Sequence, residues 1–369
     1  MPNRREFLRN VAGASAGMFL LGSGIAGEVP ALAQSAGGAK RREVMVGGRR
    51  VKTVDIHCHI SIPEVSELLK GTSLDRTGKN NLGGYDDTGL TGPRLQEMDR
   101  EGVDIQALSI NTFWNGADRD LASRLINFQN EKLAALVATR PDRFVAFASV
   151  SLQFPELAAQ QLEEAMKRWG FRGAGIAGGV PGEEISSPKF DPFWAKAEEL
   201  QALIFMHPAD SAIVTGVNKR VQGNGVLTNV IGNPLETTIF LSHMIFDGTL
   251  DRFPNLKLLA AHGGGFLPSY ADRSDHGCLV FPKQCDKTLK KHPTEYLKQI
   301  YVDTIVFTPE ALRHLIAVVG VSQLGIGTDY PYPWETNPVD HVLHTPGLSD
   351  ADRTAILGGN MCKLLKIPT

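Results

Sequence analysis

The stretch Thr53-Val54-Asp55-Ile56-His57-Cys58-His59 decides the fold that we expect for the rest of the chain. It is typical of a short β-strand, residues 53–57, that ends in two histidines one residue apart. Because side chains alternate along a strand, His57 and His59 should point the same way and could share one divalent ion. Cys58 should point to the opposite face as a small buried residue. Taken alone, the pair fits two ordinary polar residues equally well.

Further β-branched or apolar runs follow at residues 104–110, 144–150, 173–176, 203–207, 256–262, 300–303 and 324–328. Helical patterns lie between them, among others at residues 120–139, 155–169, 190–200 and 309–319. Eight strands alternating with helices predict an α/β protein with a parallel sheet closed into a (β/α)₈ TIM barrel. A doubly wound open sheet is the alternative, but no GxGxxG motif opens a helix.

Two long segments exceed what a minimal barrel needs. Residues 66–92 follow the first predicted strand, and residues 210–250 follow the fifth. Both come after the carboxyl end of a strand, which in a TIM barrel is the active-site face. We therefore expect them to form lids or walls of the site.

The N-terminus has the features of an export signal. Residues 3–9, Asn-Arg-Arg-Glu-Phe-Leu-Arg, resemble the twin-arginine signal, and a short glycine-containing apolar stretch follows. Ala31-Leu32-Ala33 matches an A-x-A cleavage site. We expect a signal peptide over residues 1–33, a linker over 34–50 and a barrel domain over 51–369, with a periplasmic mature protein. The alternative is a disordered basic N-terminus of a cytoplasmic protein.

Composition excludes some classes of function. The chain has 369 residues and a formal net charge of -2, which does not favour binding to nucleic acid or to a membrane after processing. Its four cysteines form no CxxC pair, so a structural zinc finger is not expected. The spacing of Cys278 and Cys285 leaves open whether they form a disulfide.

Further candidate ligands lie at the ends of three other predicted strands. His207, His262 and Asp329 each follow an apolar run, so they should meet His57 and His59 on the carboxyl face of the barrel. A cluster of imidazoles with a carboxylate suits Zn²⁺, with Mn²⁺ as the alternative. The fourth predicted strand ends without a lysine or glutamate that could bridge a second metal. One metal per chain is therefore expected.

At these residues the chain resembles the amidohydrolase superfamily. It is most similar to the branch that contains aminocarboxymuconate-semialdehyde decarboxylase and related aromatic-acid decarboxylases. The resemblance covers roughly residues 53–367. It rests on the motifs Val54-Asp55-Ile56-His57-Cys58-His59, Arg94-Leu95-Gln96-Glu97-Met98-Asp99 with Gly102-Val103-Asp104, His207-Pro208, Ala261-His262-Gly263-Gly264-Gly265, Gly327-Thr328-Asp329-Tyr330-Pro331-Tyr332-Pro333 and Gly359-Asn360.

The resemblance implies roles for these side chains. His57, His59, His207 and Asp329 match the metal ligands of the family. His262 matches a histidine beside the metal that handles a proton, and Asp329 is the other candidate for proton transfer. His262 and Asp329 are therefore the expected catalytic residues.

The resemblance also implies how substrate binds. Arg273 matches an arginine that binds the substrate carboxylate from a neighbouring subunit, which implies a homodimer, and Lys79 matches a lysine that lines the site. A second carboxylate-binding arginine of the family would fall at Gly83 and is absent. The aromatic residue that follows His-Pro in the family decarboxylase is Ala209 here. These departures argue against aminocarboxymuconate semialdehyde itself as the substrate.

The expected function is non-oxidative, metal-dependent decarboxylation of a small aromatic or unsaturated carboxylic acid. The alternative is hydrolysis of an ester, lactone or amide with the same metal, because the motifs of the two classes are almost the same. A hydratase or a non-catalytic binding protein with this fold are further alternatives. The five retained histidine and aspartate side chains argue against a binding protein.

Overall fold

The computed structural model describes residues 41–75, 90, 92–209, 218–221, 226–285 and 289–368. The chain divides into two compact units, Met1–Gly38 and Ala39–Thr369, and the described residues all belong to the second. The predicted signal peptide, Lys79 and Gly83 therefore lie outside the described residues. No helix in the described ranges combines the length and apolar character needed to cross a membrane.

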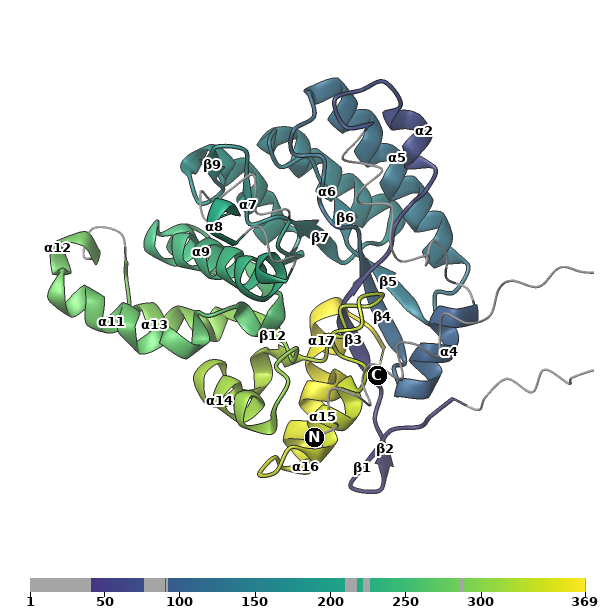
Figure 1. Ribbon diagram of the computed structural model, residues 1–369, viewed down its shortest axis with the longest axis vertical. Coiled ribbons are helices and arrows are strands. Elements are labelled where there is room, and N and C mark those ends of the chain that lie inside the picture. Colours follow the sequence, from purple (N-terminus) through teal and green to yellow (C-terminus); the bar gives the residue numbers. More distant parts are fainter. Residues whose placement is uncertain are drawn as a thin grey trace, which may run out of the picture. The chain divides into compact units, whose positions relative to one another are not determined.

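Within these ranges, eight parallel strand positions form the centre of the second unit (Figure 1). They match the strands predicted from the sequence. They are β3 (Val54–His59), β4 (Ile105–Ser109), β5 (Phe144–Ala146) continued by β6 (Ala148–Ser149), β7 (Gly173–Ile176), β10 (Leu203–Met206), β11 (Lys257–Ala260), β12 (Ile300–Asp303) and β13 (Leu324–Gly325). Their sequence order is also their order around the sheet.

Backbone hydrogen bonds close the sheet into a barrel between β3 and the segment that follows β13. Ile56 N donates to Ile326 O at 2.9 Å, and His59 N donates to Tyr330 O at 2.6 Å. On the opposite side, β4 pairs with β5 and β6 pairs with β7, so the strand that is interrupted at Phe147 joins the two sheets. The predicted TIM barrel is thereby confirmed.

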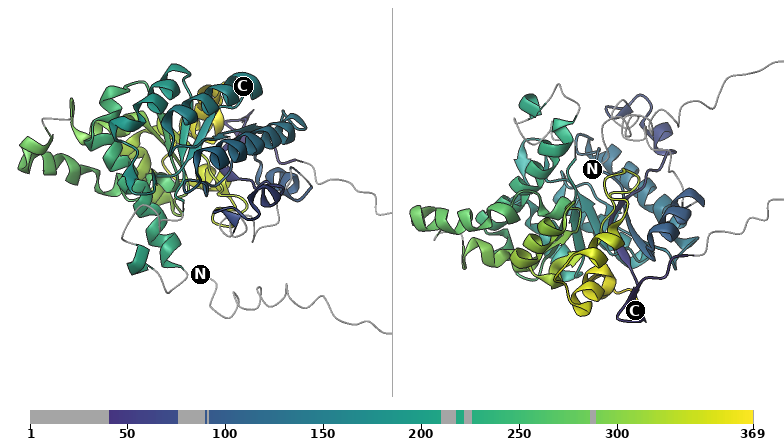
Figure 2. Two further views of the ribbon diagram at one scale, coloured as in Figure 1. Left: turned by 90° about the horizontal axis from the view of Figure 1, so that it is seen from above. Right: turned by 60° about the horizontal axis from the view of Figure 1, so that its bottom comes forward.

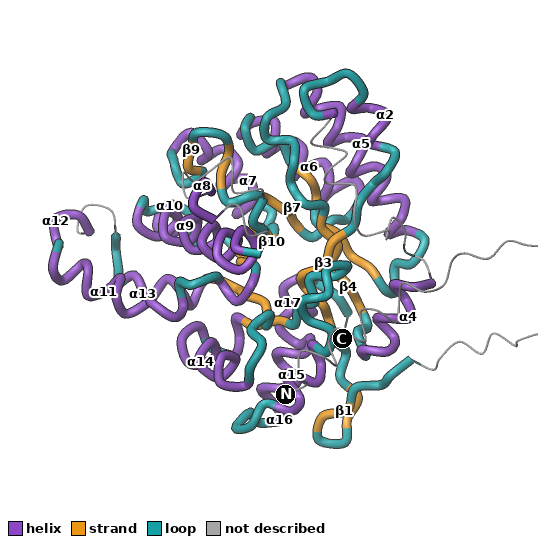
Figure 3. Tube along the Cα trace, in the orientation of Figure 1, coloured by secondary structure: helices purple, strands orange, loops and turns teal. Residues whose placement is uncertain are grey.

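Helices surround the strands, as the tube view shows (Figure 3). The longer ones are α4 (Gly92–Glu101), α5 (Arg119–Ala138), α6 (Pro155–Trp169), α7 (Asp191–Glu199), α9 (Asn233–Phe246), α11 (Ala271–Val280) and α14 (Pro309–Val319). The shorter ones are α2 (Val65–Leu69), α8 (Asn218–Val221), α10 (Thr249–Arg252), α12 (Pro282–Cys285), α13 (Pro293–Tyr296), α15 (Pro338–His344), α16 (Asp350–Thr354) and α17 (Asn360–Leu365).

The start of α14 shows why the predicted helix boundaries agree with the structure. The Thr308 hydroxyl oxygen accepts from Ala311 N at 3.2 Å, and Pro309 occupies the first turn, where no N–H is needed. The helices α5, α6, α7 and α14 lie within one residue of their predicted bounds.

Part of the segment predicted as a linker belongs to the barrel domain. The strands β1 (Met45–Val46) and β2 (Arg49–Arg50) pair as a hairpin, and Val44 and Val46 are buried. Gly47 and Gly48 supply the two positive φ angles, 56° and 75°, that a two-residue hairpin turn of this type requires.

Residues 210–250 were expected to form a lid or a wall, and the second half of this segment is a helix of the barrel. Residues 233–246 form α9, the helix that connects β10 to β11. Apolar side chains occupy most faces of α9, so the sequence lacks the polar stripe that marks a surface helix. Residues 210–217 and 222–225, and most of the segment 66–92, lie outside the described residues.

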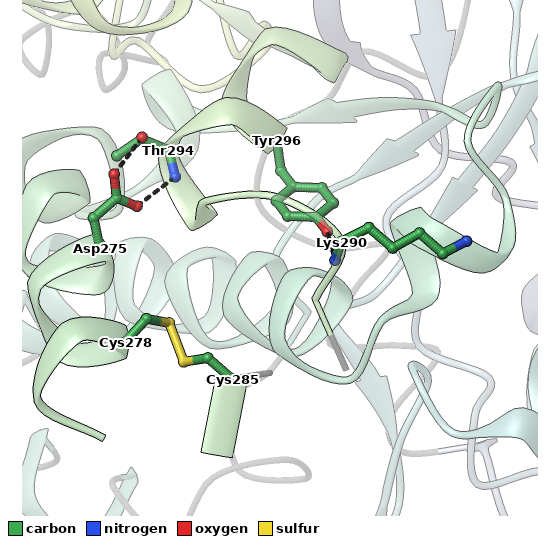
Figure 4. The surroundings of a disulfide bond; sticks show 6 residues. All are labelled: Asp275, Cys278, Cys285, Lys290, Thr294 and Tyr296. Atoms are coloured by element: carbon green, nitrogen blue, oxygen red, sulfur yellow. Dashed lines mark hydrogen bonds between the residues drawn. A yellow bond between two sulfur atoms is a disulfide. The ribbon is translucent and has the colours of Figure 1, made fainter. Parts of the chain in front are cut away.

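Between β11 and β12 the chain forms a projecting arm, which consists of α11, α12 and α13. Both views in Figure 2 and the view in Figure 1 show α11 and α12 extending beyond the ring of barrel helices. A disulfide between Cys278 and Cys285 joins α11 to α12 (Figure 4). Asp275 on α11 accepts from the backbone N and the hydroxyl of Thr294, at 2.9 and 2.6 Å, which ties α11 to α13.

Candidate metal centre

Five side chains converge at the carboxyl ends of the strands. His57 and His59 lie on β3, His207 follows β10, His262 follows β11 and Asp329 follows β13. The register of β3 against β4 shifts between Asp55 and Cys58. Such an irregularity re-aims neighbouring side chains. Accordingly, Asp55 bonds to the β4 side chain of Gln106, whereas His57 reaches the cluster.

The distances within the cluster suit a shared divalent cation. His57 Nε2 lies 3.2 Å from His59 Nε2, and both nitrogens lie near Asp329 Oδ1, at 3.2 and 3.0 Å. Two ligands of a tetrahedral metal with metal–nitrogen bonds of about 2.1 Å are separated by about 3.4 Å. His207 Nε2 lies somewhat farther out, 3.8 Å from Asp329 Oδ1.

His207 gives independent evidence that the cluster fits a metal ion. In the described part of the chain, neither ring nitrogen of His207 has a hydrogen-bond partner, although both atoms are buried. Buried polar atoms are normally satisfied, so an unsatisfied pair indicates a site for a water or an ion. Candidate ligand atoms of His57, His207, His262 and Asp329 all lie within 4.8 Å of one another. The donor set is therefore the kind that binds a metal.

The electrostatics of the cluster agree with this fit. Burial lowers the pKa of His59 to about 4 and that of His207 well below its usual value, so both imidazoles keep free lone pairs near neutral pH. Burial also acts to lower the pKa of His57, but the Asp329 and Asp303 carboxylates outweigh it and raise that pKa to about 10. Without a metal, a proton on His57 balances these carboxylates. A divalent cation would supply that positive charge instead.

Asp303, the last residue of β12, orients two of the histidines. Its Oδ2 accepts from His57 Nδ1 and from His262 N, both at 2.7 Å, and its Oδ1 accepts from Gly263 N at 2.9 Å. A hydrogen bond at Nδ1 leaves Nε2 of His57 facing the cluster. This role of Asp303 was not predicted from the sequence, although Asp303 ends a predicted strand just as the candidate ligands do.

Ser109, the last residue of β4, holds the second histidine of β3. Its hydroxyl lies 2.9 Å from His59 Nδ1, which again leaves Nε2 for the cluster. The position of Ser109 near the end of a predicted strand was the only sequence feature that pointed to this role. Because serine is not a typical metal ligand, Ser109 was not predicted as a site residue.

Two residues of the cluster have a left-handed backbone, with φ 56° at His262 and 62° at Asp329. This conformation is unfavourable for residues other than glycine and is concentrated at functional sites. After His262 the chain passes close to α9. A Cβ on Gly265 would lie 2.3 Å from Pro234 O, so only glycine fits there. The glycine run therefore lets the chain turn tightly after His262.

Among the described residues, the predicted site residue Arg273 does not lie in the cluster. Arg273 is exposed on α11 and lines a groove of about 710 Å³ between α9 and α11. Apolar and aromatic side chains dominate this groove, among them Leu235, Phe246, Phe266, Tyr270 and Phe281. Ala209 follows His207 and is half-buried. Cys58 is buried and its thiol donates to Ala107 O at 3.3 Å, which confirms its structural role.

Comparison with known proteins gives a consistent result. The family model described as Amidohydrolase matches residues 54–367. The 2-amino-3-carboxymuconate-6-semialdehyde decarboxylase of Dictyostelium discoideum is 33% identical, over 74% of this chain and 75% of that protein. The gamma-resorcylate decarboxylase of Polaromonas sp. (strain JS666) is 29% identical, over 74% of this chain and 86% of that protein.

Solved structures show the same fold. A dihydroxybenzoic acid decarboxylase from Polaromonas sp. JS666, with bound manganese and the inhibitor 2-nitroresorcinol, superimposes with a TM-score of 0.73. It is 24% identical, and the match covers 86% of this chain and 97% of that chain.

Proposed function

Because the chain belongs to the amidohydrolase family, we propose that it is a metal-dependent, non-oxidative decarboxylase of a small aromatic or unsaturated carboxylic acid. The observation that carries this proposal is the largely buried cluster of four histidines and Asp329 at the carboxyl face of the barrel. The names of the matched relatives, which are decarboxylases, favour this reaction over hydrolysis.

The proposed ligands are His57, His59, His207 and Asp329, and they would hold one metal per chain. We propose Zn²⁺, which histidine-rich sites prefer, with Mn²⁺ as the alternative that the manganese-containing structural neighbour supports. When bound, the metal supplies a Lewis acid that polarises substrate oxygen atoms.

His262 is the proposed proton donor. Its Nε2 lies 3.6 Å from Asp329 Oδ2, and Asp303 fixes its backbone N–H. In the reaction the bond between the substrate carbon and its carboxylate breaks, carbon dioxide leaves, and the electron pair remains on that carbon. A proton from His262 then forms the new C–H bond, so that one proton is consumed for each carbon dioxide released.

The substrate carboxylate is proposed to meet Arg273 of a second copy of the chain. Large apolar side chains near Arg273 are exposed, with Tyr270 at 67%, Leu279 at 70% and Phe281 at 59%. A patch of this kind on a projecting arm is typical of a protein–protein contact. We therefore propose a homodimer in which the arm reaches the site of the partner. Lys79 is a second proposed carboxylate contact, and Gly83 and Ala209 favour a small monoacid.

The reaction itself is tested with substrate labelled at the carboxylate. We expect labelled carbon dioxide and the decarboxylated acid from a panel of hydroxybenzoic and unsaturated acids, and no turnover of their methyl esters, because an ester cannot release carbon dioxide or bind Arg273 as an anion. Chelated enzyme is the control. Cleavage of esters or lactones without gas release would establish hydrolysis instead.

Shared sites are tested by mixing two inactive variants, Arg273→Ala and His262→Asn. Random exchange of subunits should place both intact residues in one site of each mixed dimer, which restores about a quarter of wild-type activity. Each variant alone serves as the control. Absence of recovery, with subunit exchange proven by mass spectrometry, would assign Arg273 to its own chain or to no site.

For residues 1–33 we propose a twin-arginine signal peptide that directs export to the periplasm. Changing Arg4 and Arg5 together to lysine should leave uncleaved protein in the cytoplasm, because the export route reads the arginine pair. Fractionation followed by intact-mass measurement checks this. The matched control is Arg9→Lys, which alters the same segment without touching the pair and should be exported as the wild type is. Normal periplasmic accumulation of the double variant would overturn the proposal.

A further inference from the structure

A buried polar chain of three residues lies behind the metal cluster, on the side of α4. Arg94 of α4 is fully buried, and its Nη1 donates to Gln106 Oε1 at 2.9 Å. The amide of Gln106 in turn donates to Asp55 Oδ2 at 3.0 Å. A glutamine can do this because it carries an acceptor and a donor on one side chain. Gln106 therefore connects a buried cation to a buried carboxylate. We call Arg94, Gln106 and Asp55 the relay.

Both ends of the relay hold the strand that carries two of the proposed ligands. Arg94 Nη2 donates to the backbone oxygen of His59 at 2.5 Å. Asp55 Oδ1 accepts from the backbone N of His57 at 3.1 Å. Both histidines are thus fixed through their own backbone atoms, whereas Asp303 and Ser109 orient their rings.

Both ends of the relay also contact the segment that carries Asp329. Asp55 Oδ2 accepts from the Thr328 hydroxyl at 2.7 Å, and Asp55 Oδ1 accepts from Thr328 N at 3.2 Å. On the far side of Asp329, the guanidinium of Arg94 lies over the ring of Tyr330, 4.4 Å from its centroid. The relay therefore contacts the residue before Asp329 and the residue after it.

These contacts cross the seam at which the barrel closes. β13 ends at Gly325, and beyond it the seam depends on single backbone bonds such as Asp329 N to His57 O at 2.8 Å. The left-handed backbone of Asp329 is unfavourable unless the surrounding structure enforces it. Side-chain contacts to the residues on both sides of Asp329 can hold its backbone in this conformation. Burial makes each of these contacts stronger than it would be in water.

We propose that Arg94, Gln106 and Asp55 are positioning residues that set the distance between the ligands on β3 and the ligand Asp329. They touch neither substrate nor metal, and they act through the backbone of His57, His59 and Asp329. This inference rests on the proposed metal ligands, but not on the reaction that the metal serves. Metal binding without substrate therefore tests it separately from decarboxylation.

The experiment removes the hydrogen bonds of the middle residue with the variant Gln106→Leu. Leucine has a similar size to glutamine but no polar side-chain atoms. Metal affinity is measured for Mn²⁺ and Zn²⁺ by chelator competition, and the visible spectrum is recorded for enzyme loaded with Co²⁺. We expect affinity to fall about 10- to 100-fold, as when the outer partners of metal ligands are lost. The cobalt spectrum should shift, because the ligand geometry changes.

The matched control is Asp104→Asn. Asp104 is a buried carboxylate at the opposite end of β4, where it accepts from Thr53 N at 2.9 Å and from Arg50 Nη2 at 2.9 Å. This variant should lower the melting temperature of the metal-free protein while leaving metal affinity and the cobalt spectrum as in wild type. The control thus separates loss of stability from loss of positioning.

A second variant, Arg94→Lys, keeps the buried charge in case Gln106→Leu does not fold. A lysine cannot bond to Gln106 and to His59 O in the forked geometry of arginine, so we expect weaker metal binding and a shifted cobalt spectrum here too. Wild-type affinity and an unchanged spectrum in either folded variant would overturn the proposal. That result would leave the relay with a role in stability alone.

Discussion

The variant His57→Ala is expected to lose its metal and its activity together, while the barrel still folds. Loss of an outer partner of a ligand weakens metal binding about 10- to 100-fold, so loss of a ligand should exceed that range. His57 also lies between two carboxylates, 2.7 Å from Asp303 and 3.2 Å from Asp329, and alanine leaves both without this partner. Metal content by mass spectrometry, circular dichroism and turnover check the result.

A matched control for this variant is His243→Ala. His243 on α9 also pairs with a carboxylate, at 2.8 Å from Asp247, but its side chain is 40% exposed. The control should keep its metal and its activity. Stoichiometric metal in His57→Ala would contradict the ligand assignment, and about two metals per chain in the wild type would contradict the single-metal proposal.

Substitution of His262 should instead remove activity and spare the metal. Asparagine is the appropriate replacement, because it tolerates the left-handed backbone of this position better than alanine does. Removal of a positioned proton donor lowers turnover by about 10²- to 10⁴-fold. We therefore expect His262→Asn to bind one metal per chain and to be almost inactive.

The test of this second prediction is metal analysis beside single-turnover kinetics. His314→Asn, at an exposed histidine on α14, is the control and should behave like the wild type. Because His262 lies within ligand distance of the cluster, the outcome discriminates between two roles. Loss of metal in His262→Asn would make His262 a ligand rather than the proton donor.

The sequence was sufficient to predict the barrel and the residues that meet at its carboxyl face. Strand periodicity and the position of a residue at a strand end are local features, so His57, His207 and Asp329 could be identified without knowledge of their contacts. The groups that orient these side chains could not be identified in this way. Asp303 and His57 are 246 residues apart in sequence, and only the closed barrel brings them together.

Other features depended on context that spacing does not contain. Because apolar side chains occupy most faces of α9, this barrel helix was not predicted within a segment expected to form a lid or a wall. The interval between Cys278 and Cys285 was compatible with free thiols, and only the turn from α11 to α12 brings the two sulfurs together. Arg94 belongs to a family motif, but its contacts to His59 and Tyr330 follow from the packing of α4 against the seam.

The disulfide has a consequence for how the protein is produced. Cys278 and Cys285 lie on the arm, whereas the histidines and the aspartate of the metal cluster follow barrel strands. A host cytoplasm keeps thiols reduced, so recombinant chains made there would acquire metal in the barrel while the arm stays uncrosslinked. The oligomeric state measured on such material would be that of a protein whose arm lacks the disulfide. Refolding in an oxidising buffer, or secretion during expression, yields the form on which assembly should be judged.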